Sequence, residues 1–218
     1  SGFRPGFSGR CGWCRIWPAP ESFKEGDDVA DYYGVTRWEM PIPIQLRGKA
    51  YPRPHSFIKY DVENINNENP FTLKDDVVIL EKIHGSNIGI GIVNGEIHVC
   101  SRNMALKEEL GNTYWDTIKD YPQVFEALRS LYEDELNPNR NAIWIHGEIY
   151  GIQDLKYDAQ SKPKFLAFDM RHELEEFAPY EAFVVICNHF NIPRVPELYV
   201  GEYSNTIVKE LTDGMEQV

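Results

Sequence analysis

Asn94 and Gly95 constrain the fold of this chain more than any other feature of the sequence. Isoleucine and glycine alternate before them over residues 88–92, and polar and aliphatic residues alternate after them over residues 96–99. An Asn-Gly pair between two alternating strands favours a two-residue type I′ turn, because both of its positions require a positive φ. The sequence therefore predicts an antiparallel β-hairpin.

The register of this hairpin predicts where a site is formed. With Asn94 and Gly95 as the turn, Val93 faces Glu96, and continuing the ladder places Asn87 opposite Arg102. The hairpin then brings residues 101–103 to the same end of the sheet as residues 82–85. We therefore expect a pocket at that end.

The rest of the chain indicates segregated strands and helices. Apolar patterns predict strands over residues 77–80, 144–151 and 164–170, and helices over residues 123–135, 180–189 and, with Ser204 as a cap, 204–211. A short helix is expected within residues 25–33, and a proline-punctuated extended connector follows over residues 40–54. Strands and helices that do not alternate favour an α+β domain built on antiparallel sheets.

Composition narrows the possible partners and location. The 22 basic and 34 acidic residues give a formal charge of −12, which disfavours a broad electrostatic grip on nucleic acid but leaves room for one local basic pocket. The longest apolar run, residues 182–187, is too short to cross a membrane, and the polar first ten residues do not resemble a secretory signal. We expect a cytoplasmic monomer. Cys11 and Cys14 have the spacing of a metal or redox pair but lack a second pair, so local packing is the preferred interpretation.

Lys82 is the residue most suited to chemistry. It ends an apolar strand and is followed by Ile83, His84 and Gly85, where glycine permits a close backbone turn. A lysine there can extend into a pocket with its stem packed, although a single lysine at a strand end is more commonly a solvated surface residue. Whether Lys82 is a pocket residue or a surface residue therefore has to be judged from the residues around it.

Four ordered segments supply that context. Residues 81–87 (EKIHGSN) resemble the Lys-x-x-Gly element of covalent nucleotidyltransferases in its RNA ligase form. Residues 101–103 (SRN), 146–151 (HGEIYG) and 165–169 (FLAFD) resemble the next three elements of that superfamily, in the same order. Lys-x-x-Gly alone is weak, whereas the ordered set is specific. The chain thus looks like an ATP-dependent RNA ligase. Residues 25–41 more loosely resemble the connector that follows an N-terminal OB-type module in one branch of RNA ligases.

The resemblance implies a role for each residue of the first element. Lys82 would attack the α-phosphate of ATP, expel pyrophosphate and carry AMP, which requires an uncharged amine. Glu81 would accept a hydrogen bond from the adenine amino group, although it could equally be an ordinary strand residue. His84 occupies a position that is often Asp in DNA ligases and capping enzymes, and it could otherwise be an inconsequential loop histidine.

The later elements imply contacts with the rest of the nucleotide. Asn87 and Arg102 would hold ribose and phosphate groups, or would be an ordinary cross-strand polar pair. Glu148 would accept a hydrogen bond from a ribose hydroxyl, or would face water on an edge strand. Phe168 would stack on adenine, or would simply belong to the core. No protein residues are expected to form a full metal cage. Water-mediated Mg²⁺ or Mn²⁺ near Glu81, His84 and Glu148 is a hypothesis.

The resemblance also implies a domain organisation and a reaction. Residues 1–59 would be the remnant of the OB-type module and its connector, and residues 60–218 a nucleotidyltransferase (ATP-grasp-like ligase) domain. With ATP and Mg²⁺ or Mn²⁺, the enzyme would join a 3′-OH to a 5′-phosphate on nicked or broken RNA. The alternatives are a DNA ligase, an mRNA-capping guanylyltransferase, and a nucleotide- or RNA-end-binding fragment without turnover.

Two later elements of the superfamily are missing from the sequence. These are a Glu-Gly strand and a Lys-x-Lys pair that contacts the α-phosphate. Residues 175–177 and 162–164 are poor substitutes, because they lie on the wrong sides of the other elements. We expect the chain to be truncated where the Glu-Gly strand would begin.

Overall fold

The computed structural model describes residues 3–4, 14–15, 23–24, 30–34, 41–60, 71–134, 141–151, 157, 162–172 and 177–212. The chain divides into two compact units, Ser1–Glu39 and Met40–Val218. In the first unit, β1 (Phe3–Arg4) pairs with β2 (Cys14–Arg15), and α1 (Ala30–Tyr33) lies within the range 25–33 where a short helix was expected. The expectation for the pair of Cys11 and Cys14 stays a prediction, because Cys11 lies outside the described residues.

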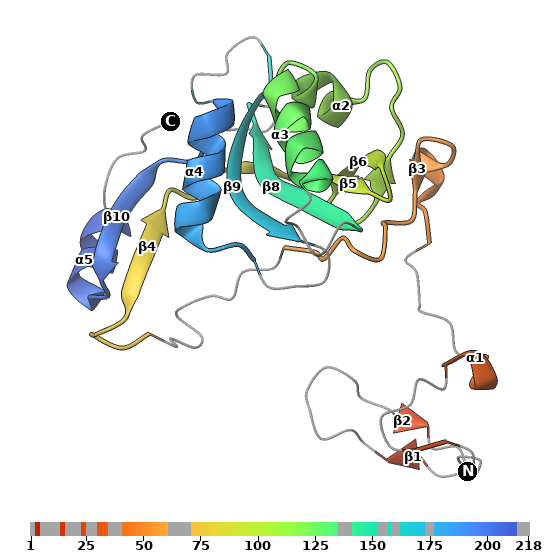
Figure 1. The fold of residues 1–218 in the computed structure, drawn as a ribbon, viewed down its shortest axis with the longest axis horizontal. Helices are drawn as coiled ribbons and strands as arrows, with labels where there is room; N and C mark the ends of the chain where they lie inside the picture. The colour runs from red at the N-terminus through yellow and green to blue at the C-terminus, as the bar shows by residue number, and fades with distance from the viewer. Residues whose placement is uncertain are drawn as a thin grey trace. The chain divides into compact units, whose positions relative to one another are not determined.

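The second unit is built on a six-stranded antiparallel sheet (Figure 1). Its strand order is β3 (Ala50–Tyr51), β7 (Ala105–Leu106), β6 (Glu96–Ser101), β5 (Gly85–Val93), β8 (Ala142–Tyr150) and β9 (Lys164–His172). The α+β class expected from the sequence is confirmed.

The β5–β6 hairpin forms around the expected turn. Asn94 and Gly95 have φ values of 50° and 85°, as a type I′ turn requires, and Val93 pairs with Glu96. The ladder ends at the pair of Ile88 with Ser101, because Arg102 follows in a bend. The register is the expected one, but the ladder ends one pair before Asn87 and Arg102, so these two residues are not paired in the sheet.

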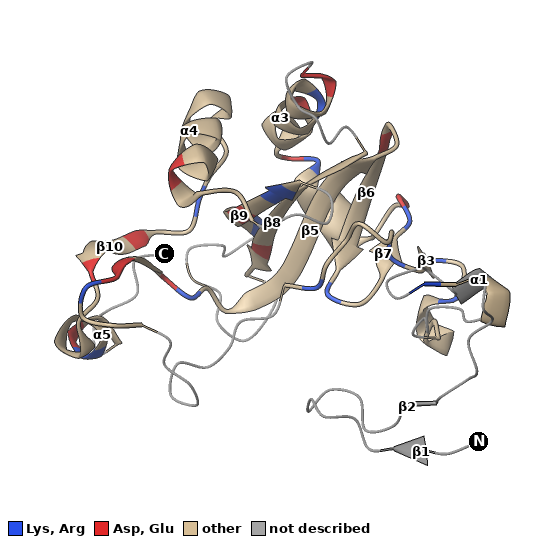
Figure 2. Cartoon of the chain, turned by 60° about the horizontal axis from the view of Figure 1, so that its bottom comes forward, with Lys and Arg blue, Asp and Glu red and all other residues tan. Residues whose placement is uncertain are grey.

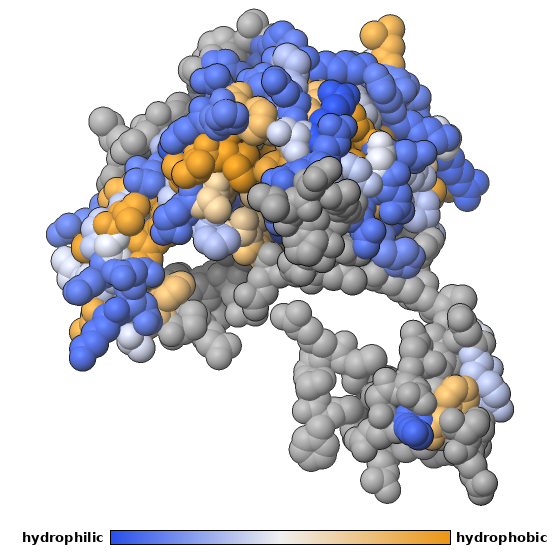
Figure 3. Space-filling view, viewed as in Figure 1, coloured by the Kyte–Doolittle hydropathy of each residue, from blue (hydrophilic) through white to orange (hydrophobic). Residues whose placement is uncertain are grey.

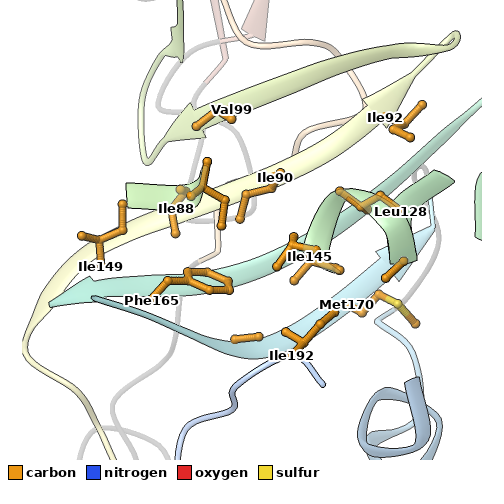
Figure 4. Close-up of a cluster of buried hydrophobic side chains, with 14 of the residues drawn as sticks. Ile88, Ile90, Ile92, Val99, Leu128, Ile145, Ile149, Phe165, Met170 and Ile192 are labelled. Carbon is orange, nitrogen blue, oxygen red and sulfur yellow. The ribbon is translucent and has the colours of Figure 1, made fainter. Parts of the chain in front are cut away.

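Three helices cover one face of the sheet and enclose the main core. They are α2 (Thr113–Ile118), α3 (Pro122–Glu133) and α4 (Tyr180–Phe190), of which α3 and α4 lie over β8 and β9 in Figure 1. The side chains of Ile88 and Ile90 reach this core and are fully buried (Figure 4). Each isoleucine buried in this way stabilises the fold by about 1.5–3 kcal/mol.

Helix α4, which forms over the range expected from the sequence, buries only one of its faces. Phe183 and Cys187 are buried, but Val185 is 66% exposed, so the helix is amphipathic. Its end at Asn191, which adopts a left-handed conformation, is a common helix stop. In Figure 3, hydrophilic residues dominate this face, with hydrophobic areas around α4 and around β10.

A second, smaller sheet carries the strand that leads to Lys82. It pairs β4 (Asp76–Leu80) with β10 (Glu197–Glu202), and α5 (Asn205–Thr212) follows. Ser204 caps α5 as expected, since its Oγ accepts a hydrogen bond from the backbone N–H of Thr206 at 3.2 Å. Strand β10 was not expected from the sequence.

The connector before β4 packs against the main sheet. A 3₁₀ turn, η1 (Ile44–Leu46), precedes β3, and the ring of Phe57 lies 4.9 Å from that of Trp144 between centroids. The domain boundary expected between residues 59 and 60 stays a prediction, because it concerns the relation of this connector to an N-terminal module.

Candidate functional site

A cavity of about 830 Å³ lies at the end of the hairpin where a pocket was expected. Six of the seven candidate site residues line it: Glu81, Lys82, Asn87, Arg102, Glu148 and Phe168. They come from the segment after β4, from β5, from the bend after β6, from β8 and from β9. Segments more than 80 residues apart in sequence therefore contribute to one cavity.

Lys82 enters the cavity from the segment that joins the two sheets. Before it, the backbone N–H of Glu81 donates to the carbonyl of Pro196 at 2.9 Å, and after it Ile83 is buried. Gly85 packs so closely on β8 that an added Cβ would lie 2.2 Å from the carbonyl oxygen of Ile149. Only glycine permits this approach, which fixes the chain directly after the lysine.

Asn87 and Glu148 occupy facing positions on β5 and β8. Strand β8 is an interior strand, between β5 and β9, so the reading of Glu148 as a water-facing edge residue was wrong. The side-chain oxygen Oδ1 of Asn87 is buried and has no hydrogen-bond partner within the described residues. A buried acceptor of this kind can be satisfied by a donor group of a bound molecule.

The carboxyl group of Glu148 is strongly perturbed by its surroundings in the cavity. Burial raises its pKa to about 7, against the opposing effects of the Lys82 charge and a hydrogen bond from the Gly85 backbone. A carboxyl group with this pKa can accept or release a proton near neutrality. The positive charge of Lys82 and the acidic group of Glu148 thus act on each other inside the cavity.

Tyr60 and Tyr114 also line the cavity, and sequence reasoning missed both. Tyr114 lies on α2, and its hydroxyl is hydrogen-bonded to the side chain of Ser86. Burial raises the pKa of Tyr114. Asn112 caps α2 by accepting from the backbone N–H of Tyr114, so this asparagine was the one sequence signal for the helix.

His84 is the candidate residue that the structure does not bring into this set. Its side chain is exposed and does not line the cavity, and its backbone N–H donates to the hydroxyl of Tyr157 at 2.8 Å. The cavity itself is mixed in charge, because Lys82, Arg102, Glu81 and Glu148 all line it. Figure 2 shows that β5 carries no charged residues.

The described part of the chain offers no ready-made metal cage. Within it, no group of three or more His, Cys, Asp or Glu side chains is arranged to hold a metal ion. Glu81 and Glu148 nevertheless supply two carboxyl groups to one cavity, and Mg²⁺ is commonly bound by one or two carboxylates plus water and phosphate oxygens. The donor set thus fits such an ion.

Among the helices described, none is long and apolar enough to cross a membrane.

A lysine that follows a strand, a close glycine turn and a cavity lined by carboxyl, amide, guanidinium and aromatic groups match the arrangement expected from the resemblance to covalent nucleotidyltransferases. The family model for RNA ligases matches residues 75–217, more than half of the chain. This chain belongs to the RNA ligase family.

Solved structures agree with this assignment. The RNA ligase of Naegleria gruberi with pyrophosphate is 24% identical, with a TM-score of 0.64, and the match covers 90% of this chain and 59% of that one. Variants of the same ligase match with ATP and Mn (24% identity, TM-score 0.62) and with AMP and Mn (25%, 0.63), each over 88% of this chain and 58% of the other. The chain thus spans less than two thirds of that ligase. A search of curated proteins found no match.

Proposed function

We propose that this chain is the nucleotide-binding part of an ATP-dependent RNA ligase. One observation carries the proposal: a single cavity is lined by Lys82 and by five further residues that were predicted from four separate sequence elements. The family membership and the ATP- and AMP-bound states of the Naegleria gruberi ligase support it. ATP and RNA ends would be its substrates.

In the proposed first step, the amine of Lys82 attacks the α-phosphorus of ATP. A P–N bond forms, the bond to pyrophosphate breaks, and the amine loses its proton. Glu148, whose pKa lies at about 7, is placed to influence where that proton goes. Protonation of the P–N bond then lets Lys82 leave when a 5′-phosphate takes up AMP, and a 3′-OH finally displaces AMP.

The remaining residues would hold the nucleotide. Arg102 presents a guanidinium suited to forked contacts with phosphate oxygens. Asn87 and Glu148, side by side on β5 and β8, would face the ribose hydroxyls, and Phe168 would stack on adenine with Glu81 at its amino group. A bound Mg²⁺ or Mn²⁺ would neutralise phosphate charge, held through water by Glu148.

Incubation with α-labelled ATP tests the proposal. The chain should become labelled, Lys82→Ala should abolish the label, and Lys74→Ala, an exposed lysine before β4, should retain it. Omission of divalent metal should also remove the label. A band that persists in Lys82→Ala would contradict the proposed nucleophile.

Two comparisons separate the alternatives. Labelling by α-labelled GTP in preference to ATP would indicate a capping guanylyltransferase, and transfer of AMP to DNA ends in preference to RNA ends would indicate a DNA ligase. Binding of ATP without any label would indicate a binding fragment. A cytoplasmic location and a monomeric state stay predictions, which fractionation and sedimentation can test.

A further inference from the structure

A β-bulge occurs in β9 at the residue proposed to stack on the base. His146 on β8 pairs with Asp169, but the next residue, Gly147, pairs with Ala167, so Phe168 has no partner in the ladder. Ala167 and Met170 both belong to the main core, although residues three apart on a regular strand face opposite sides. The extra residue therefore changes the face of the strand and places the neighbours Phe168 and Asp169 on the side away from that core.

Tyr60 contacts both of these neighbours. Its ring meets that of Phe168 edge to face, with centroids 4.7 Å apart and an interplanar angle of 61°, and its hydroxyl donates to Oδ2 of Asp169 at 3.0 Å. The other carboxyl oxygen, Oδ1, accepts from the backbone N–H of Met170 at 2.8 Å. Tyr60 itself comes from the connector before β4, and it lines the cavity beside Phe168.

Two further aromatic rings pack against the ring of Tyr60. Its centroid lies 5.1 Å from that of Phe177 and 5.6 Å from that of His146. His146 is fully buried, and neither of its ring nitrogens has a hydrogen-bond partner among the described residues. It acts here as an aromatic wall, because burial, with the Arg171 charge, lowers its pKa to about 3 and keeps it neutral.

We propose that Tyr60 is a positioning residue that fixes the plane of the Phe168 ring, so that the purine base of a bound nucleotide stacks on a preset surface. At the bulge, Phe168 is not held by strand pairing. Tyr60, which lies outside this sheet, holds its ring instead by an edge-to-face contact, and the hydrogen bond from its hydroxyl to Asp169 fixes Tyr60 itself. This proposal rests on the proposed function, since it assigns the base to Phe168.

Calorimetry with two ligands tests this role. In a Lys82→Ala parent, which cannot form the covalent adduct, the dissociation constants of ATP and of ribose 5-triphosphate are compared. Tyr60→Ala should weaken ATP binding about 3- to 10-fold, as expected for a lost aromatic contact, and Tyr60→Phe about 2- to 5-fold. Binding of ribose 5-triphosphate, which has no base to stack, should be unchanged.

The control is Tyr51→Phe in the same parent. Tyr51 belongs to the same connector, and its hydroxyl forms a comparable 3.0 Å hydrogen bond with His98, but it does not line the cavity. It should bind both ligands as the parent does. Tyr60→Phe keeps the ring, so it remains informative if Tyr60→Ala fails to fold.

The outcomes distinguish the two proposals. If the parent does not bind ATP, the proposed function fails, and the positioning role fails with it. If the parent binds ATP and both Tyr60 variants bind it equally well, only the positioning role is overturned. It is also overturned if the variants weaken ATP and ribose 5-triphosphate by the same factor, because the residue would then act on the whole cavity.

Discussion

Asn87 and Glu148 face each other on two adjacent interior strands, within the cavity that also holds Lys82. One position contributes a buried amide oxygen without a partner among the described residues, and the other a carboxyl group whose pKa burial raises to about 7. The Glu148 carboxyl accepts one hydrogen bond, from the backbone of Gly85, and its two oxygens can accept more. Both side chains can therefore accept hydrogen bonds from the hydroxyl groups of a ligand.

The raised pKa of Glu148 predicts a pH-dependent stability. Between about pH 4.5, the ordinary value, and pH 7 the native chain holds a proton that the unfolded chain has released, so stability falls as pH rises through this window. Glu148→Gln mimics the protonated group. We expect it to unfold with a free energy about 1 kcal/mol higher than that of the wild type at pH 8, after allowance for partial solvent exposure.

Chemical denaturation at pH 5 and pH 8 measures this difference. The advantage of Glu148→Gln should be several-fold smaller at pH 5, because the carboxyl group is protonated in the native wild type there and only the ionisation of the unfolded chain still contributes. Glu126→Gln, at an exposed position on α3, serves as the control and should behave as the wild type at both pH values. An equal advantage at both pH values would contradict the assignment.

Arg102 is expected to act on phosphate affinity. Arg102→Ala should raise the ATP concentration needed for half-maximal adduct formation about tenfold, because a charge-assisted forked contact is lost. Arg102→Lys should recover only part of this, since an ammonium cannot form the fork. Titration of label incorporation against ATP measures both, with Arg129→Ala on α3 as an exposed control; unchanged titrations for Arg102→Ala would exclude the contact.

Gly89 is predicted to be required by the packing of the connector. A Cβ at this position would lie 2.2 Å from the ring of Phe57, so Gly89→Ala should destabilise the fold by about 1–3 kcal/mol. Denaturant unfolding measures this cost. Adding Phe57→Leu should recover part of it in a double-mutant cycle, and strict additivity of the two changes would show that the ring is not the obstacle.

Gly95 tests backbone strain without packing. Nothing lies within 4 Å of a Cβ built there, so Gly95→Ala should cost about 1 kcal/mol through its φ of 85° alone. Gly95→Asn should cost less, because asparagine tolerates the left-handed region. Thermal unfolding of the two variants checks the order, and a smaller cost for alanine would contradict the type I′ turn.

Local patterns predicted those parts of the fold whose partners are close in sequence. The hairpin register followed from Asn94 and Gly95, and Ser204 marked the start of α5. The six-residue helix α2 was missed because it is short and Asn112, its N-cap residue, is a weak signal for a helix start. Strand β10 was missed because its partner lies more than 110 residues earlier, and Gly201 and a register shift interrupt its pattern.

The site was predictable where it depended on the ordered elements and not where it depended on tertiary contacts. Lys82, Arg102 and Glu148 were placed by the elements that carry them. Nothing local to Tyr60 shows that the connector returns to the sheet, and no residue pattern announces the bulge at Phe168. The side chain of His84 lies outside the cavity lining, because closeness to Lys82 in sequence does not fix the direction of a loop side chain.

The pairing of β4 with β10 has a consequence for biosynthesis. The strand that presents Lys82 belongs to a sheet completed only by residues 197–202, and the backbone just before Lys82 is hydrogen-bonded to Pro196. During translation, the segment with Lys82 therefore leaves the ribosome long before its partner strand exists. The pairing that fixes the backbone just before Lys82 can therefore form only after almost all of the residues described here have been made.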